Sequence, residues 1–401
     1  MNTSPSAPTR THYDVVIIGG AMMGSSAAWW LTRHPDFDGS VLVVERDPSY
    51  EGSSTAATNS CMRQQFSTEV NVRISQFTAE FVRTFTEWFD DPEVPELATH
   101  FFGYLYLANT EAFAQSLRAS QNRQASWGAA TRILTPNEIA ERYPFYNLDD
   151  IVCGSHNPVD EGYFDGGTMF DMFRRHARRQ GAEYCTDEVV GLGQTGNHIT
   201  SISLASGATV GCGTVVNAAG PRAASIAAMA DIELPVEPRK RYSFVFQAAE
   251  PLERDLPLTI DPTGVHCRSD GGYYQAGCPP DDDHAVDPDD RTLDPNIWED
   301  TIWPILAHRI PAFERIKWVN RWVGHYAFNT LDQNAIVGPH PEFDNLIFMN
   351  GFSGHGLQQS PAIGRGVAEW IIHGEFRAID LAPLGFQRVL DGTPFVEHAV
   401  I

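Results

Sequence analysis

Residues 13–24 read YDVVIIGGAMMG, and this stretch decides the fold class. Tyr13 to Ile18 ends in a β-branched run, which is typical of a strand buried on both faces. The glycine turn Gly19 to Gly24 follows, and then an apolar helical stretch. A second apolar run, residues 40–45, ends in Glu45. This order of strand, glycine turn, helix, strand and acid predicts the first βαβ unit of a dinucleotide-binding fold.

Each part of the turn has a mechanical role in such a unit. Gly19 permits the sharp turn, and Gly24 lets the helix pack closely on the strand. The helix N-terminus offers free N–H groups to a pyrophosphate, and Glu45 is placed to accept hydrogen bonds from a ribose. Ala21 stands where the fingerprint has its middle glycine, which puts a methyl group beside the phosphates.

Composition limits the function classes. The 401 residues include 28 basic and 51 acidic side chains, which gives a net charge of −23. This charge argues against a nucleic-acid binder and against docking on anionic membranes. A hydrophobic fraction of 42% fills a real core and excludes global disorder. The length predicts two domains, or one large α/β domain with an insertion.

Six scattered cysteines without metal-ligand spacing are typical of free thiols in a reducing compartment. Residues 1–11 are predicted to form a flexible leader, because they are small and polar and lack the apolar stretch of a secretory signal. No apolar run is long enough for a membrane span. We therefore expect a soluble cytoplasmic enzyme.

A second glycine turn, residues 350–356, lies late in the chain between a strand at 345–349 and a helix at 363–373. Two turns that donate backbone N–H groups suit a long ligand with two polar ends, and FAD fits them better than NAD. One turn would hold the pyrophosphate, and the other would stabilise negative charge on the reduced flavin. An NAD-dependent dehydrogenase is disfavoured because the second turn would lack a purpose.

The rest of the α/β pattern comes in pieces. A helix is predicted from about residue 165 to Gly181, and short strands are predicted at 186–190, 199–204, 214–218 and 242–247. The stretches 96–150 and 236–320 are irregular. The acidic loop 281–290 is interpreted as a solvated surface excursion.

These motifs together resemble the D-amino-acid-oxidase/sarcosine-oxidase superfamily of FAD enzymes over residues 12–375. The resemblance rests on Gly19 to Gly24, Glu45, Asn217 to Pro221, Trp322-x-Gly324-x-Tyr326 and Gly351 to Gly356. Other stretches are similar to the branch of FAD-dependent oxidoreductase-domain proteins associated with assembly of mitochondrial complex I and its bacterial relatives. They are residues 62–66, 329–334, 337–341 and 354–359.

The resemblance implies a mixed α/β and α+β fold, in which a Rossmann-like FAD-binding domain is interleaved with a mixed-sheet substrate domain. The FAD-binding domain would comprise residues 12–95, 151–235 and 321–380. The substrate domain would comprise 96–150 and 236–320, and 381–401 would be a C-terminal tail. The implied reaction oxidises the C–N bond of an amino acid or N-alkylated amino acid by hydride transfer to flavin N5, giving an imine that water hydrolyses.

The sequence departs from the sarcosine-oxidase pattern at the sites of covalent FAD attachment. Gly324 stands at the position of the attachment cysteine, and the loop 52–57 lacks the histidine that dimethylglycine-dehydrogenase relatives use. We therefore expect dissociable FAD, with His325 as the least improbable exception.

The sequence also departs from that pattern at two lysines. Gln358 replaces the lysine that holds the substrate carboxylate, so Arg63 becomes the candidate for carboxylate recognition, unless it only supports the flavin. Arg241 and Arg268 are further candidates. Gln275 falls at the position of the lysine linked to oxygen activation, which favours a dehydrogenase over a fast oxidase.

Two histidines and two tyrosines are candidates for the chemistry. His355 and His325 could accept a proton or orient the amine, and purely structural hydrogen bonds are the alternative for both. Tyr326 and Tyr242 could line the substrate pocket or could be ordinary packed aromatics. The predicted FAD contacts are Gly19, Gly20, Ala21, Met23, Gly24, Glu45, Arg46, Ser53, Ser54, Arg63, Gln64, Val189, Ala219, Gly220, Gly324, Gly351, Gly354, His355, Gly356, Leu357 and Gln358.

Two function hypotheses follow. The first is an FAD-dependent amine or amino-acid oxidoreductase with a small-molecule substrate and with oxygen or an electron carrier as acceptor. The second is a flavoprotein scaffold or assembly factor, in which FAD is structural and the partner is another protein. Reduction of the flavin by an amine in the absence of air discriminates between them.

Overall fold

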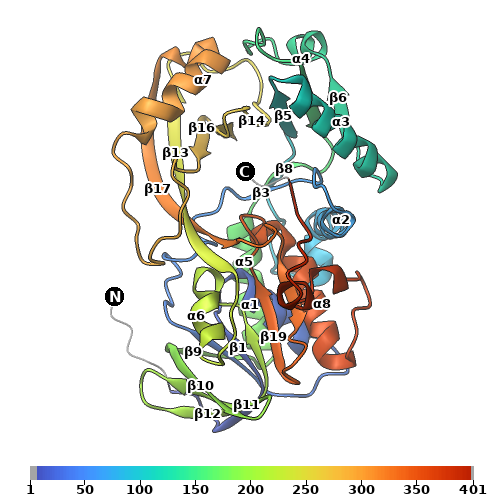
Figure 1. The fold of residues 1–401 in the computed structure, drawn as a ribbon, viewed down its shortest axis with the longest axis vertical. Coiled ribbons are helices and arrows are strands. Elements are labelled where there is room, and N and C mark those ends of the chain that lie inside the picture. Colours follow the sequence, from blue (N-terminus) through green and yellow to red (C-terminus); the bar gives the residue numbers. More distant parts are fainter. Residues whose placement is uncertain (1–6, 399–401) are drawn as a thin grey trace.

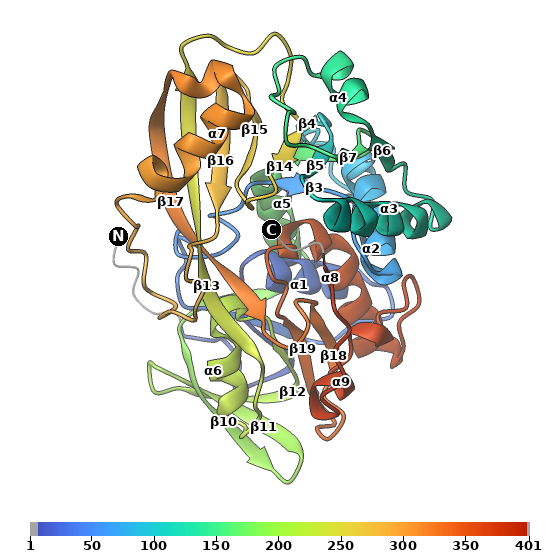
Figure 2. The same cartoon turned by 45° about the horizontal axis from the view of Figure 1, so that its top comes forward.

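The computed structural model describes residues 7–398, in which the strands form two eight-stranded sheets and a three-stranded one. Figure 1 shows the first sheet in the lower half of the molecule and the second in the upper half. The long strands β13 (Val236–Ala248) and β17 (Ile316–Asn329) extend from one half to the other, and Figure 2 shows the same arrangement after rotation. They therefore tie the two halves together.

The first sheet has a parallel centre, in the order β9-β2-β1-β12-β19. The antiparallel hairpin β10-β11 extends one side through β12, and β18 pairs antiparallel with β19. The strands of this sheet are β1 His12–Ile18, β2 Val41–Glu45, β9 Glu183–Thr186, β10 Val189–Thr195, β11 His198–Leu204, β12 Thr209–Asn217, β18 Ile336–Pro339 and β19 Leu346–Asn350.

Strand β1 is buried on both faces, as its composition predicts. Val15 and Ile17 point into one core, and Val16 and Ile18 point into another. Successive side chains of a strand alternate between faces, so one β-branched run serves both cores. Helices α1 (Met22–Thr32), α2 (Glu69–Arg83), α5 (Gly166–Arg179) and α8 (Gly356–His373) contribute to the first core, and α6 (Ala223–Ala228) contributes to the second.

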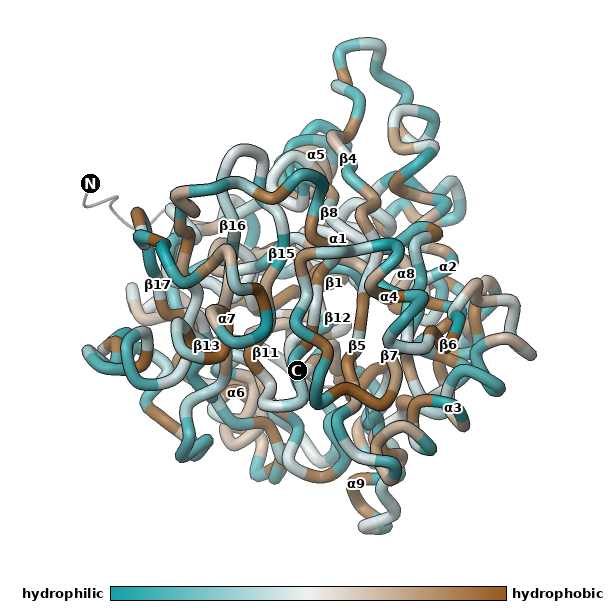
Figure 3. Tube along the Cα trace, turned by 90° about the horizontal axis from the view of Figure 1, so that it is seen from above, coloured by the Kyte–Doolittle hydropathy of each residue, from teal (hydrophilic) through white to brown (hydrophobic). Residues whose placement is uncertain are grey.

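The second sheet is mixed, in the order β17-β13-β16-β15-β14-β5-β7-β6. Its aromatic core includes Phe244, Phe246 and Phe313, covered by α4 (Pro136–Arg142) and α7 (Trp303–Arg309). The outer loops are mostly hydrophilic in Figure 3. The remaining strands are β5 Tyr104–Ala108, β6 Arg132–Leu134, β7 Cys153–Asn157, β14 Leu258–Ile260, β15 His266–Asp270 and β16 Tyr273–Cys278.

A small sheet supplies the loop that carries Arg63. Its strands are β3 (Cys61–Met62), β8 (Gly162–Phe164) and β4 (Thr99–His100), in the order β3-β8-β4. Arg63 follows β3 directly, so the pairing of β3 with β8 fixes the position of the Arg63 backbone.

The structure differs from the sequence-based expectations in several elements. The stretch 96–150 is less irregular than expected, because it contains the helix α3 (Glu111–Ser126), which is polar on most of its surface. The predicted strand 186–190 is two strands that break at Asp187. Helix α8 begins at Gly356, earlier than expected, and ends at His373 as predicted; the next residue, Gly374, has a left-handed conformation. Strand β7 lies in the second sheet, although the predicted boundary assigns it to the FAD-binding part.

The two ends of the chain contact the fold. Residues 1–6 of the predicted leader lie outside the described residues, and Thr9 donates a backbone hydrogen bond to Glu183 at 2.7 Å. The predicted tail contains α9 (Gln387–Leu390) and the fully buried Glu397. None of the six cysteines forms a disulfide among the described residues. Within residues 7–398, none of the helices has the length and apolar character that a bilayer crossing requires.

Candidate functional site

A cavity of about 650 Å³ lies at the carboxyl ends of the parallel strands in the first sheet. The residues that follow β1, β2, β12 and β19 line one part of it, and strands β5, β13, β14 and β15 of the second sheet line the other. Open α/β sheets bind ligands at the carboxyl ends of their strands, because the helix N-termini gather there. The tertiary structure therefore joins the two predicted glycine turns in one site.

The first glycine turn brings strand, helix and ligand site into close approach. Gly19 has a φ of +100°, and a Cβ on Gly24 would lie 1.9 Å from the carbonyl oxygen of Gly19. Glu45 accepts hydrogen bonds from the backbone N–H groups of Gly20 and Asp47, both at 2.8 Å. Burial raises the pKa of Glu45, whereas these two hydrogen bonds lower it. Glu45 also lines the cavity.

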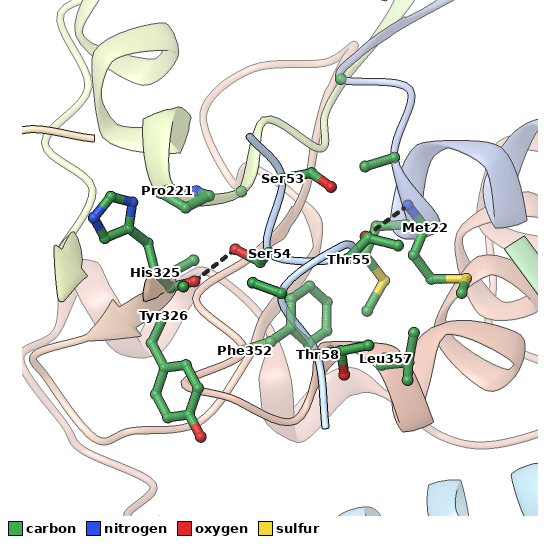
Figure 4. A pocket seen from close by; sticks show the side chains of 18 of the residues that line it. Met22, Ser53, Ser54, Thr55, Thr58, Pro221, His325, Tyr326, Phe352 and Leu357 are labelled. Carbon is green, nitrogen blue, oxygen red and sulfur yellow. Dashed lines mark hydrogen bonds between the residues drawn. The ribbon is translucent and has the colours of Figure 1, made fainter. Parts of the chain in front are cut away.

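The loop 52–58 forms another wall. The Thr55 hydroxyl accepts a hydrogen bond from the Met22 N–H at 3.2 Å, and the Ser54 hydroxyl donates to the His325 carbonyl at 2.6 Å (Figure 4). A Cβ on Gly324 would lie 2.7 Å from the Cβ of Ala57. This close approach leaves no room for the attachment cysteine of the sarcosine oxidases.

The second glycine turn packs on Tyr326. Gly354 has a φ of +94°, and a Cβ there would lie 2.4 Å from Cζ of Tyr326. Helix α8 begins two residues later, and Gly356, Leu357 and Gln358 line the cavity. The N-terminal residues of α8 thus line the same cavity as those of α1, and a helix N-terminus stabilises negative charge.

Arg63 is buried where the second glycine turn meets the small sheet. Its Nη2 lies 2.8 Å from Nε2 of His355, and its guanidinium carbon lies 4.6 Å from the centre of the Phe66 ring. Its backbone N–H donates to Oε1 of Gln358 at 2.7 Å. The glutamine that replaces the carboxylate-binding lysine therefore helps to position the arginine, and Arg63 itself lines the cavity.

The two candidate histidines are both engaged in hydrogen bonds. His355 Nε2 faces the Arg63 guanidinium, so this nitrogen acts as the acceptor. His325 Nε2 donates to the Asp290 carbonyl at 2.8 Å, and Nδ1 contacts Arg291. Burial, together with the positive charge of Arg291, lowers the pKa of His325 to about 4. Figure 4 shows its ring turned away from the Tyr326 ring.

Most of the predicted site residues reach the cavity wall. Gln64 instead donates its N–H to Glu161 at 2.7 Å, and Gln275 is buried behind the wall, bonded to Arg268 and Asn59. Gly20, Gly24 and Gly351 also lie off the wall. The predicted residues that line the cavity are Gly19, Ala21, Met23, Glu45, Arg46, Ser53, Ser54, Arg63, Val189, Ala219, Gly220, Tyr242, Gly324, His325, Tyr326, Gly354, His355, Gly356, Leu357 and Gln358.

Sequence reasoning missed several wall residues. Tyr104 and His266 lie on β5 and β15, and no local motif marks either of them. The acidic loop 281–290 is solvated as predicted, since none of its residues is buried, but Asp289 also lines the cavity and Asp290 lies 2.7 Å from Nζ of Lys240. The dense charge of the loop predicts that it is solvated. The basic residue that pairs with it, Lys240, is brought to the loop only by the fold.

Comparison with known proteins agrees with this geometry. Residues 14–370 match the family described as FAD dependent oxidoreductase. The chain belongs to this family. The oxidoreductase is 36% identical to FAD-dependent oxidoreductase domain-containing protein 1 of Bos taurus over 439 aligned residues, covering 100% of this chain and 89% of that protein.

Two further relatives widen the comparison. Dimethylglycine dehydrogenase of Mus musculus is 25% identical to the oxidoreductase and aligns with 95% of this chain and 45% of that protein. The crystal structure of L-proline dehydrogenase from P. horikoshii has a TM-score of 0.82 and 26% identity, covering 95% of this chain and 98% of that chain. The predicted FAD-binding fold with mixed sheets is thereby confirmed.

FAD is the cofactor of this oxidoreductase. The residues present fit it: the contact between Gly24 and Gly19 packs the start of α1 closely on the end of β1, where a pyrophosphate would lie, and Glu45 lines the cavity as an acceptor for a ribose. The turn at Gly354 to Gly356 fits the flavin end. When bound, FAD supplies two-electron oxidation.

Proposed function

We propose that this oxidoreductase oxidises the C–N bond of an amino acid or N-alkylated amino acid. The observation that carries the proposal is the position of Arg63, a buried guanidinium in the wall of the cavity that the flavin-end turn also lines. A planar guanidinium binds a carboxylate bidentately, so it can fix the substrate by its carboxylate with the amine-bearing carbon towards the flavin.

The neutral amine would lose two electrons and one proton from the carbon beside nitrogen as a hydride, for which bound FAD would supply the acceptor. The resulting iminium ion would take up water and separate into a carbonyl compound and a protonated amine. Arg63 holds the carboxylate in this scheme, and Gln358 and His355 hold Arg63. The Nε2 of Gln358 is buried without a hydrogen-bond partner among residues 7–398, so it can donate to the substrate.

We further propose that FAD is held without a covalent bond and that a carrier other than oxygen takes the electrons. The close approach of Gly324 to Ala57 supports the first point. The second is supported by the neutral Gln275, which lies where oxygen-activating relatives have a lysine. The cytoplasmic location stays a prediction.

The test is anaerobic reduction of the purified yellow protein by a panel of simple and N-alkylated amino acids, followed at the flavin absorbance band. Charge-assisted hydrogen bonds contribute about 1.5–3 kcal/mol, so we expect Arg63→Ala to lower the second-order reduction rate about 10- to 150-fold for carboxylate substrates. Arg83→Ala is the control, because Arg83 is half-exposed and pairs with Asp160 at the surface. If no amine bleaches a flavin that dithionite still reduces, the scaffold hypothesis replaces the enzyme.

A further inference from the structure

We propose that the substrate end of the cavity is built for an amine that carries two carboxylate groups, one bound by Arg63 and the other by Arg241. This inference rests on the proposed function and names the substrate class of the same site. It is carried by the placement of the two guanidinium groups, by unpaired donors in the wall and by the distribution of charge along the cavity.

Arg241 forms an anion site separate from that of Arg63. It lies on β13 and makes a bidentate ion pair with Asp283 at 2.8 and 3.0 Å. Its guanidinium carbon lies 4.5 Å from the centre of the Tyr326 ring. Arg63, by contrast, contacts Phe66 and His355. The two arginines are therefore held by different residues.

Arg241 keeps donor capacity that its partners do not use. The residue is 9% exposed and lines the cavity, and its Nε has no hydrogen-bond partner among residues 7–398. Asp283 and the Lys240 carbonyl occupy only the two terminal nitrogens. A buried guanidinium N–H without a partner is costly, so a ligand carboxylate that reaches it gains a charge-assisted hydrogen bond.

His266 lines the same cavity as the two arginines. It is buried, its Nε2 lies 3.1 Å from the Asn59 side-chain nitrogen, and its Nδ1 has no partner among the described residues. Burial first, and then the positive charges of Arg241, Arg268 and Arg63, lower the pKa of His266 to about 4. Three guanidinium groups thus act on one neutral imidazole that lines the cavity.

Charge is separated along the cavity wall. The substrate end presents Arg63, Arg241 and His266 with Tyr104 and Gln358, and no carboxylate among the described residues. Asp283 and Asp270, which pair with Arg241 and Arg268, lie off the wall. In a chain of net charge −23, such an end selects for negative charge in the ligand. The acids on the wall are Glu45, Asp47, Asp187, Glu188 and Asp289, from the first sheet's strand ends and the acidic loop.

The test uses holoenzyme and matched pairs of amines in anaerobic stopped-flow reduction: iminodiacetate against N-ethylglycine, and glutamate against norvaline. Each pair replaces one carboxylate by a methyl group. We expect the dicarboxylate of at least one pair to have a second-order reduction rate at least tenfold higher. Arg241→Gln should bring the ratio of the dicarboxylate rate to the monocarboxylate rate close to one, whereas Arg63→Gln should slow both members.

Two further variants separate the loss of the Arg241 side chain from general effects of substitution on β13. Arg239→Gln is the matched control, because Arg239 lies two residues away on the same strand, also pairs with Asp283 at 3.6 Å, and does not line the cavity. Arg241→Lys keeps the charge and should retain part of the dicarboxylate preference. Equal rates within every pair, or an equal loss for both members in Arg241→Gln, would overturn the proposal.

A binding measurement separates this inference from the proposed function. Succinate and butyrate are titrated into the oxidised holoenzyme and followed by perturbation of the flavin spectrum, which needs no oxidation step. We expect succinate to bind at least tenfold more tightly than butyrate, and Arg241→Gln to abolish the difference. If no amine reduces the flavin, the proposed function fails; if succinate and butyrate bind equally, the dicarboxylate site fails.

Discussion

Gly354 combines a left-handed backbone with a contact that leaves no space for a side chain. Its φ is +94°, and an added Cβ would lie 2.4 Å from the Tyr326 ring. Gly374 is a matched position, with a φ of +74° and nothing within 4 Å of an added Cβ. The pair separates the cost of backbone conformation from the cost of displacing Tyr326.

We predict that Gly374→Ala lowers the free energy of unfolding by about 1–2 kcal/mol, the cost of a left-handed backbone for alanine. Gly354→Ala should lose about 1–3 kcal/mol more, because the methyl group overpacks against the ring. It should also weaken FAD binding, since the turn lines the cavity. Urea unfolding and FAD fluorescence titration check both effects. Equal losses in the two variants would contradict the contact with Tyr326.

At the scale of elements, the C-terminal segment holds the start of α2. Glu397 is fully buried, and its carboxylate accepts hydrogen bonds from the N–H and hydroxyl of Ser67, the hydroxyl of Thr68 and the amide of Asn71, at 2.7–3.0 Å. A carboxylate at a helix N-terminus is also stabilised by the helix dipole. The segment therefore fixes the loop that follows Arg63.

We predict that Glu397→Gln lowers the free energy of unfolding by about 1–3 kcal/mol, because an amide NH₂ would face these donors. Its KM for carboxylate substrates should rise more than its kcat falls, since the variant loosens the Arg63 loop and leaves the flavin in place. Glu375→Gln is the control, because Glu375 is an exposed partner of Arg377 and should change stability by less than about 0.5 kcal/mol. A Glu397 variant that matches this control would contradict the role of the segment.

At the scale of the whole molecule, buried histidines make stability depend on pH. Burial is the main reason that the pKa values of His156, His266 and His325 are lowered to about 4. The unfolded chain binds these protons near pH 6.5, so it takes up more protons than the folded chain between pH 6.5 and 4. The stabilising contribution of each histidine is therefore present above pH 6.5 and is lost as the pH falls.

His156 lies off the cavity wall, bonded to the Tyr143 hydroxyl at 3.0 Å, so it tests this effect separately from the site. Each such histidine contributes a slope of about 1.4 kcal/mol per pH unit. We predict that His156→Gln loses about 2 kcal/mol less stability than the wild type between pH 7.5 and 5.0. Urea unfolding at the two pH values measures the difference. Parallel losses would show that His156 is protonated equally in both states.

The order of the elements around both glycine turns could be predicted, because each turn is local. Strand β1, helix α1 and Glu45 follow within one short stretch, and side-chain alternation and backbone sterics act on neighbours. Helix α3 could not be predicted in the same way, since its polar surface carries a weak apolar pattern. The solvent exposure of the acidic loop could be predicted from its dense charge, whereas its ion pair with Lys240 could not, because Lys240 comes from a distant strand.

The sequence by itself determined the nucleotide-binding unit, the second glycine turn and the family, since these depend on residue types at short spacing. Only the tertiary structure decided which side chains from distant parts of the sequence contact one another. It brings Asn71 to Glu397 across 326 positions and Arg63 to His355 across 292. It also buries Glu161 with the donors Gln64, Gln65 and Asn157, and burial raises the pKa of Glu161 to about 8. Burial and long-range charge depend on the packing of whole sheets, which no local pattern encodes.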